Sequence, residues 1–287
     1  MFKYYLYKFG QFLVTRLPLK LSYRVGIFFS DLQFAFSRLD RISVCNNLKN
    51  ILSSSEDISS QAREVFRNFG RYLVEFFRVG EALDSQFIEK NVRIVNREYV
   101  DETLRKGRGG IITTAHIGNW ELGAIVLGML RYPIVAVALP HKERPVNDLF
   151  NKQREGKGVT VVPVAHAVRR CLESLKENKL IGVVADRDFS AHGIVMDFLG
   201  RKALIPKGAA IFAFKTGAPV IPTFMIREAD GTFTLTFEKP IYPPQVIDGH
   251  VGEAELTEFI RKYLVYIENC IRNYPTQWLM MREFWIK

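Results

Sequence analysis

Short apolar runs alternate with amphipathic segments over the larger part of this chain. The runs have the length of buried strands and are bounded by glycine, proline or polar residues. They cover residues 110–115, 134–139, 159–164, 180–185, 219–226 and 232–238. Apolar positions at helical spacing between them predict helices over 119–131, 145–156, 167–178 and 206–216. This alternation predicts an α/β fold with a mostly parallel central sheet flanked by helices.

Two longer helices are predicted on either side of this alternating region. Residues 59–78 carry apolar side chains at helical spacing, with Ser59 or Ser60 available as the N-cap. Residues 253–273 show the same spacing and predict a closing helix. The polar segment 228–232 predicts a turn between the last two strands, so we expect an antiparallel pair at one edge of the sheet.

The first 50 residues are basic and amphipathic. If the first residues form a helix, with about 100° of rotation per residue, aromatic and aliphatic side chains lie on one face and polar side chains lie on the other. The apolar face holds Phe2, Tyr5, Leu6, Phe9, Phe12 and Leu13, and the polar face holds Lys3, Lys8 and Gln11. Such a helix either packs on the protein body or lies in a membrane interface, and the eight bases against two acids in this segment favour the membrane. We therefore predict a membrane-associating N-terminal helical segment over 1–50, joined in one structural unit to an α/β domain over 51–287.

Composition narrows the class of protein. With 287 residues and 48% hydrophobic content the chain can bury a sizeable core, and its net charge of +10 favours anionic partners. Three widely spaced cysteines support neither a disulfide framework nor a cysteine-rich metal cluster. No run approaches the roughly 20 apolar residues of a spanning helix, and no apolar core of a signal peptide precedes a cleavage site. We therefore expect neither a transmembrane anchor nor a cleaved leader.

Polar side chains follow the predicted strands, where the functional groups of open α/β sheets gather. In strand order they are His116, Asn119 and Glu121; His141, Lys142, Glu143 and Arg144; His166; Asp186, Arg187 and Asp188; and Arg227. Because parallel strands end at the same edge of a sheet, Asp186 and Asp188 are expected on the same rim as His116. The alternative for the two aspartates is a turn held by their own hydrogen bonds.

His116 is the candidate general base, because imidazole exchanges a proton near neutral pH. Glu121 follows five residues later, which on one continuous helix would separate the two side chains by about 140°. Gly118 and the N-cap residue Asn119 permit a turn that carries His116, with Glu121 in the first helical turn behind it. In that arrangement Glu121 accepts one imidazole N–H, the other ring nitrogen takes a proton, and backbone N–H groups at the helix start hold an oxyanion. The alternative is a structural histidine at a strand end.

Other chemistries lack their motifs. The chain contains no G-x-S-x-G, no G-x-x-x-x-G-K-[ST] and no G-x-G-x-x-G, which disfavours a nucleophile-elbow hydrolase and the usual nucleotide cradles. No H-E-x-x-H or similar spacing supports a metal centre. Cys171 falls on a predicted helix without a neighbouring histidine, so a thiol nucleophile is also disfavoured.

The segment TAHIGNWELGA (114–124) resembles the diagnostic block of the bacterial lipid A biosynthesis acyltransferases and the related phosphatidylinositol mannoside acyltransferases, in the lysophospholipid acyltransferase superfamily. Further blocks match in order at 143–159, 184–188, 197–224 and 274–285, so the resemblance runs from about residue 20 to the C-terminus. The chain departs from the family pattern at Ile117, at Arg187 and in LIPKGA (204–209). These departures concern the acceptor and the acyl chain rather than the reaction.

The resemblance implies an O-acyltransferase in which His116 deprotonates an acceptor hydroxyl and Glu121 orients the histidine. The hydroxyl then attacks an acyl thioester, without an acyl-enzyme intermediate. Residues implied to bind substrate are Asn119, Arg144, Arg154, Asp186, Arg187 and Asp188. No cofactor is implied, and the co-substrate is a thioester of acyl carrier protein or coenzyme A.

The expected partners are a lipid acceptor and an anionic membrane surface, at the cytoplasmic face of a bacterial inner membrane, with no nucleic acid. Two other functions remain open on the sequence. One is a non-catalytic basic protein that binds lipid or nucleic acid. The other is an acyl hydrolase that uses the same histidine and glutamate.

Overall fold

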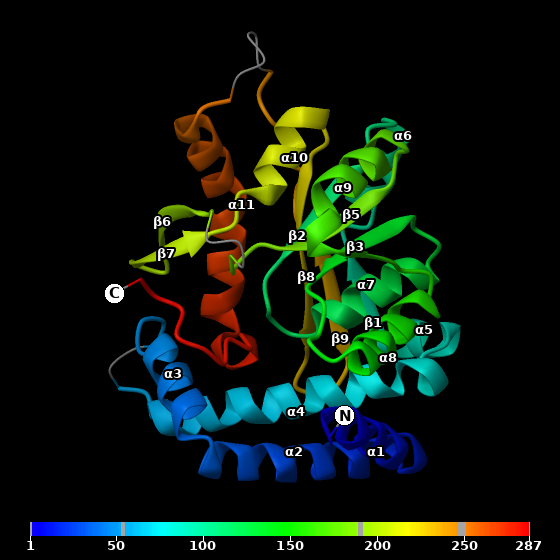
Figure 1. The fold of residues 1–287 in the computed structure, drawn as a ribbon, viewed down its shortest axis with the longest axis vertical. Helices are drawn as coiled ribbons and strands as arrows, with labels where there is room; N and C mark the ends of the chain where they lie inside the picture. Colours follow the sequence, from blue (N-terminus) through cyan, green and yellow to red (C-terminus); the bar gives the residue numbers. More distant parts are fainter. Residues whose placement is uncertain (1, 53–54, 189–191, 246–250, 287) are drawn as a thin grey trace.

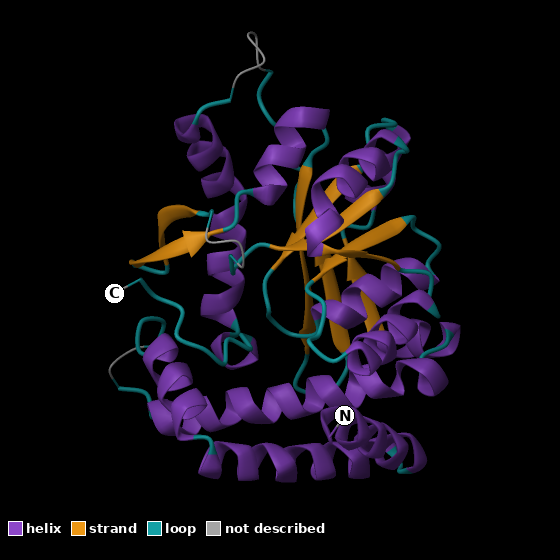
Figure 2. Cartoon of the chain, in the orientation of Figure 1, coloured by secondary structure: helices purple, strands orange, loops and turns teal. Residues whose placement is uncertain are grey.

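The computed structural model describes residues 2–52, 55–188, 192–245 and 251–286, and a seven-stranded sheet lies at its centre (Figure 1, Figure 2). Its strands are β1 (Val92–Val95), β2 (Gly110–Thr114), β3 (Ile134–Ala138), β4 (Thr160–Pro163), β5 (Leu180–Val184), β8 (Val220–Arg227) and β9 (Phe233–Phe237). They lie in the order β1-β9-β8-β2-β5-β3-β4, and every neighbouring pair is parallel except β8 and β9. The predicted α/β fold with a mostly parallel sheet is confirmed.

The antiparallel pair is present but does not form the edge. The predicted turn joins β8 to β9, and β1 then pairs in parallel on the outer side of β9, with Val92 opposite Phe233. The expectation of an antiparallel edge is therefore wrong in position. The sequence missed β1 because its four residues, VRIV, are too few to establish a period.

Helices cover both faces of the sheet. The helices after the N-terminal segment are α4 (Ile58–Ala82), α5 (Ser85–Asn91), α6 (Glu98–Arg105), α7 (Trp120–Met129), α8 (Arg144–Glu155), α9 (Ala167–Lys176), α10 (Gly208–Thr216) and α11 (Glu253–Asn273), with 3-10 turns η1 (Val164–His166) and η2 (Pro275–Gln277). One core joins α9, α10 and α11 to the face that carries Ile111. The other joins α4, α7 and α8 to the face that carries Ile112. The long predicted helix is α4, but its N-cap is Asp57, whose side chain accepts from the backbone N–H groups of Ser59 and Ser60.

A two-stranded hairpin outside the main sheet was not predicted. It consists of β6 (Ile194–Phe198) and β7 (Arg201–Ile205), joined through Leu199 and Gly200. Both turn residues have positive φ, 51° and 86°. A leucine at such a position is uncommon, so the sequence lacks the Asn-Gly or Asp-Gly signal of this turn.

The chain begins with three helices, α1 (Phe2–Arg16), α2 (Leu19–Phe36) and α3 (Arg38–Leu48). In Figure 1, α1 and α2 lie along the bottom of the molecule and α3 lies at the lower left. α2 packs closely on α4, since a Cβ built on Gly70 would lie 2.7 Å from the carbonyl oxygen of Gly26. Asp31 on α2 accepts hydrogen bonds from Arg63 and Arg67 on α4, which adds a polar link between the same two helices. The division of the chain at residue 50 stays a prediction.

The predicted apolar face of α1 is largely uncovered. Tyr5, Phe9 and Phe12 are 62%, 60% and 58% exposed. The side chains of Phe2 and Lys3, assigned to the two faces of this helix, lie outside the described residues. Within the part of the chain that the structure describes, no helix combines the length and the hydropathy required to cross a bilayer.

Candidate active site

His116 and Asp186 lie side by side at the rim of the sheet because β2 and β5 are neighbouring parallel strands. Their register pairs Thr114 with Val184, and each strand continues by two residues, to His116 and to Asp186. The backbone N–H of Ala185 still donates to the carbonyl of Thr114, at 2.8 Å, so the pairing persists past the strand ends. The expectation that Asp186 shares the rim with His116 is confirmed.

The carboxylate of Asp186 holds the imidazole of His116 directly. Nδ1 of His116 lies 2.8 Å from Oδ1 of Asp186, and the backbone N–H of His116 donates to Oδ2 at 3.0 Å. The indole N–H of Trp278 also donates to Oδ2, at 2.9 Å. A proton on Nδ1 satisfies Asp186 and leaves the basic lone pair of the ring on Nε2. The side chain of His116 is 23% exposed, so the ring reaches the surface.

Asp186 is fully buried, yet it is held in its charged form. Burial alone would raise the pKa of this carboxyl, but the positive charge and the N–H groups of His116, together with the indole of Trp278, hold the pKa below its ordinary value. The carboxylate therefore stays ionised at neutral pH and stabilises an imidazolium beside it.

Glu121 has a different partner from the one predicted. Its carboxylate accepts two hydrogen bonds from Arg154 on α8, 2.8 Å from Nε and 2.6 Å from Nη2. The expectation that Glu121 accepts the imidazole N–H of His116 differs from the structure, because Asp186 lies at Nδ1. The pair Glu121–Arg154 instead joins the first turn of α7 to α8. This pairing could not be predicted from the sequence, because local spacing does not show which helices are neighbours.

The Glu121–Arg154 pair is nearly dry, with side chains only 12% and 10% exposed. Burial disfavours the charge of Arg154, but the carboxylate of Glu121 outweighs this and raises the pKa of the guanidinium.

Glu121→Gln removes the charge that compensates Arg154, and we expect a loss of about 3 kcal/mol in the free energy of unfolding. Urea denaturation measures it. Glu173→Gln, which breaks an exposed pair on α9, is the control and should cost under about 1 kcal/mol. Equal losses would contradict a buried pair.

The turn that carries His116 requires a glycine at position 118. Gly118 has φ +59°, and a Cβ there would lie 2.0 Å from the carbonyl oxygen of Met225. Asn119 caps α7 as predicted, with its Oδ1 accepting from the backbone N–H of Leu122 at 2.9 Å. Asn119 is fully buried and forms part of the frame of the turn, and its predicted contact with substrate stays a prediction.

The remaining predicted residues differ in placement. Arg144 lies at the start of α8 with its side chain 92% exposed and pairs with Asp148 one helical turn later. Asp188 accepts hydrogen bonds from the backbone N–H groups of His192 and Gly193, which is the turn-forming alternative considered for it. Burial and the nearby charge of Arg282 lower the pKa of Arg187. Among the predicted substrate-binding residues, Asp186 is hydrogen-bonded to His116.

Two tryptophans beside His116 were not predicted. Trp278 holds Asp186 and comes from the C-terminal segment, more than 150 residues away in sequence. Trp120 lies edge-on to the imidazole, with ring centroids 5.1 Å apart, and stacks on Tyr72 of α4 at 4.7 Å. The letters GNWE contain Trp120, but only the fold shows that its ring forms a wall of the site.

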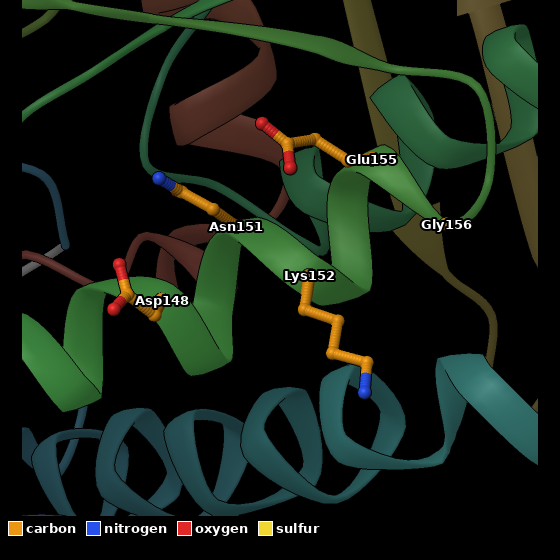
Figure 3. A pocket seen from close by; sticks show the side chains of 5 residues that line it. All are labelled: Asp148, Asn151, Lys152, Glu155 and Gly156. Atoms are coloured by element: carbon orange, nitrogen blue, oxygen red, sulfur yellow. The ribbon is translucent and has the colours of Figure 1, made fainter.

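The structure adds no support for a metal centre or a thiol nucleophile among the described residues. Among the described residues, no group of three His, Cys, Asp or Glu side chains is arranged to hold a metal ion. Burial raises the pKa of the Cys171 thiol to about 11, so it is not a nucleophile at neutral pH. The cavity in Figure 3 lies along α8 and is lined by Asp148, Asn151, Lys152, Glu155 and Gly156. It includes neither His116 nor Asp186.

The chain is similar to several known proteins. The sequence model described as bacterial lipid A biosynthesis acyltransferase matches residues 1–287. The chain is 27% identical to the phosphatidylinositol mannoside acyltransferase of Mycolicibacterium smegmatis over 78% of its own length and 72% of that protein. It is 23% identical to a lipid A biosynthesis acyltransferase of Haemophilus influenzae, over 58% and 52% of the two chains. The crystal structure of the 1-acyl-sn-glycerophosphate acyltransferase of Thermotoga maritima aligns with a TM-score of 0.40 and 17% identity, covering 89% of this chain and 99% of that one.

Proposed function

This chain belongs to the bacterial lipid A biosynthesis acyltransferase family and is an acyltransferase, and we propose that it moves a fatty acyl chain from an acyl thioester to a hydroxyl of a glycolipid precursor. The observation that carries the mechanism is the imidazole of His116 held by Asp186 at Nδ1. The relatives named as phosphatidylinositol mannoside and lipid A acyltransferases point to a glycolipid as the acceptor class.

The proposed reaction is a direct transfer. Nε2 of His116 takes the proton of the acceptor hydroxyl as its oxygen forms a bond to the thioester carbonyl carbon. Asp186, ionised and fully buried, stabilises the imidazolium that results. The C–S bond then breaks, and the proton held by His116 passes to the leaving thiolate. The products are an ester and a thiol, with no covalent intermediate on the protein.

The negative charge that develops on the carbonyl oxygen needs a positive environment. His116 directly precedes the turn into α7, and the amino end of a helix carries partial positive charge. The pair Glu121–Arg154 fixes the first turn of α7 against α8. Glu121 is thus proposed to act on the frame of the site rather than on the imidazole.

A purified-protein assay tests the proposal. The protein is given a radiolabelled acyl thioester of acyl carrier protein or of coenzyme A, and a panel of glycolipid and lysophospholipid acceptors in mixed micelles. We expect labelled acyl ester and an equal amount of thiol, dependent on both substrates. Labelled free fatty acid formed equally without acceptor would establish a hydrolase instead. Tight, salt-sensitive binding to an oligonucleotide with no transfer would establish a nucleic-acid-binding protein.

The proposed place of action is an anionic membrane surface at the cytoplasmic face of a bacterial inner membrane. Twelve of the twenty exposed large hydrophobic residues in the described chain belong to α1, α2 and α3. They form what we call the N-terminal apolar surface: Tyr5, Leu6, Phe9, Phe12, Leu19, Leu21, Phe28, Phe29, Leu32, Phe36, Leu39 and Ile42. Exposed bases lie on the same helices, at Lys8, Arg16, Lys20, Arg24 and Arg38. Apolar side chains beside bases are typical of helices that lie in a membrane interface.

Replacing two aromatic residues of this surface is expected to weaken membrane binding. Phe28 and Phe29 are 58% and 56% exposed. Phe28→Ser together with Phe29→Ser should raise the dissociation constant for vesicles containing phosphatidylglycerol about 10- to 100-fold. The variant lacks the two phenyl rings whose transfer from water into the membrane stabilises binding. Co-sedimentation with the vesicles measures it.

A matched control removes two exposed apolar side chains elsewhere. Val168 on α9 and Val195 on β6 are 61% and 56% exposed. Val168→Ser with Val195→Ser should leave vesicle binding within about twofold, because neither residue belongs to the N-terminal apolar surface. Equal losses in both double variants would refute a specific membrane-binding surface.

A further inference from the structure

A buried ionic cluster lies behind the turn that carries His116, and the proposed reaction does not use it directly. It consists of Glu75 on α4, Arg227 at the end of β8, Tyr23 on α2 and Asn119 at the start of α7, which we call the Glu75 cluster. The side chains of Glu75 and Arg227 are only 5% and 8% exposed. Charged groups are seldom buried to this degree without a partner for each hydrogen-bonding atom.

Each carboxylate oxygen of Glu75 accepts two hydrogen bonds. Oε1 accepts from Nε of Arg227 at 2.7 Å and from the hydroxyl of Tyr23 at 2.8 Å. Oε2 accepts from Nη2 of Arg227 and from Nδ2 of Asn119, both at 2.6 Å. One side chain thus joins two helices, a strand end and the N-cap of α7.

The cluster is linked to His116 through short hydrogen-bonded paths. Asn119 lies three residues after His116, and its Oδ1 is already occupied by the backbone N–H of Leu122. Its backbone N–H donates to the carbonyl of Met225 in β8 at 2.8 Å. Arg227 is bound through its backbone to Gln277, whose own carbonyl accepts from the N–H of Gly118 at 3.0 Å. Both ends of the turn therefore depend on groups that Glu75 holds.

The charge of Glu75 is required because a neutral isostere cannot satisfy the same donors. An amide at this position carries one oxygen and one NH2 group. If the NH2 group takes the position of Oε2, this group faces two donors, Nη2 of Arg227 and Nδ2 of Asn119. With the NH2 group in place of Oε1 it faces Nε of Arg227. Either orientation loses at least one hydrogen bond and leaves the guanidinium without its counter-charge.

We propose that Glu75 is a positioning residue for the acyl transfer: through Asn119 and Arg227 its carboxylate fixes the turn from β2 into α7 and so the place of the His116 imidazole relative to the acceptor hydroxyl. This inference rests on the proposed function. Glu75 touches neither substrate nor the reacting atoms in it. Its effect is on the geometry in which Nε2 meets the hydroxyl, where a displacement of the order of 1 Å costs up to about 100-fold in rate.

Glu75→Gln tests the proposal through separate measurement of kcat and KM. We expect kcat per folded molecule to fall about 10- to 100-fold, with KM for acceptor and donor changed less than about threefold. The folded fraction is fixed by circular dichroism at the assay temperature, well below the unfolding midpoint. Asp31→Asn is the matched control: it makes the same change of carboxylate to amide, and Asp31 also binds two arginines between α2 and α4. The control should lower the unfolding midpoint and leave kcat within about twofold.

A second variant separates geometry from stability. Glu75→Met with Arg227→Met removes both charges, so no uncompensated ion stays buried and the unfolding midpoint should recover. Asn119 still lacks its acceptor, so kcat should stay at least about 10-fold below wild type. Recovery of kcat together with the midpoint would show that Glu75 serves stability alone. Wild-type kcat in Glu75→Gln would also overturn the inference.

The inference and the proposed function fail in different ways. If the wild-type protein transfers no acyl group from any thioester, the proposed function fails and the Glu75 comparison has no baseline rate. If wild type and Asp31→Asn are active and Glu75→Gln equals them, the positioning role alone fails.

Discussion

His116→Ala is expected to lower kcat for acyl transfer by about a thousandfold or more. General-base catalysis by a positioned side chain contributes about 10²- to 10⁴-fold, and alanine retains no group that takes a proton. The rest of the site should persist, because the backbone N–H of His116 bonds Asp186 and its carbonyl accepts from Leu279 whatever the side chain. The measurement is the initial rate with radiolabelled thioester and saturating acceptor, together with the unfolding midpoint.

The control is His166→Ala. His166 also follows a strand at this edge of the sheet but is exposed, and its loss should change kcat less than about threefold. A second arm adds free imidazole to His116→Gly, where a small base in the vacated space should restore part of the rate. A His116→Ala enzyme that keeps more than a tenth of the wild-type kcat would exclude His116 as the base.

The fold class was predictable because the spacing of apolar residues is a local property of the sequence. Apolar residues recur every second position in a strand and about every 3.6 positions in a helix. Each predicted strand of the sheet lies within one or two residues of an observed one, and the closing helix was predicted at 253–273, where α11 lies. The elements that were missed lack such a signal. β1 has four residues, and the hairpin of β6 and β7 turns at Leu199, which takes a positive φ without the usual asparagine or glycine.

The site was predictable in part, and the limit is the order of the strands. That Asp186 follows a strand is visible in the sequence. That its strand is the neighbour of the strand before His116, in the register that places the two residues together, comes only from the assembled sheet. Local spacing favoured Glu121 as the partner of His116 because it is near in sequence. The bidentate bond from Arg154 on another helix gives Glu121 a different role.

Contacts between segments that are distant in sequence also supply the hydrogen-bonding groups around the site, and local spacing could not predict them. Trp278, Gln277 and Arg227 come from segments more than 100 residues beyond His116. Trp278 donates to Asp186, the backbone carbonyl of Gln277 accepts from Gly118, and the backbone N–H of Arg227 donates to the side chain of Gln277. Asp186 accepts from Trp278 and from His116 itself. The site is therefore formed by strand ends and loops that are distant in sequence and that pack around the short segment 114–124.

Asp186→Asn is expected to reverse the tautomer of His116 and lower kcat by about 10³- to 10⁴-fold. Oδ2 of Asp186 accepts from two donors, the backbone N–H of His116 and the indole of Trp278. The amide oxygen of asparagine must take that position, so its NH2 group faces Nδ1 of His116. Nδ1 then accepts, the ring proton moves to Nε2, and Nε2 can no longer take the proton of the acceptor hydroxyl.

Asp186→Asn keeps the volume of the side chain, so a large loss of kcat with little change in KM indicates the tautomer rather than collapse of the site. Nitrogen-15 shifts of labelled histidine report which ring nitrogen is protonated, and Asp197→Asn, an exposed carboxylate on β6, is the control for the substitution. Wild-type tautomer and rate in Asp186→Asn would rule out this role.

Acid titration gives an independent test of Asp186. Because its pKa is lowered in the folded protein, the carboxylate stabilises the fold above the ordinary carboxyl pKa of about 3.9. This contribution is lost as the pH falls through the folded pKa. The difference in unfolding free energy between wild type and Asp186→Asn should therefore shrink as the pH falls below about 4. A difference that does not shrink in this acid range would mean that the carboxylate of Asp186 does not stabilise the fold through its charge.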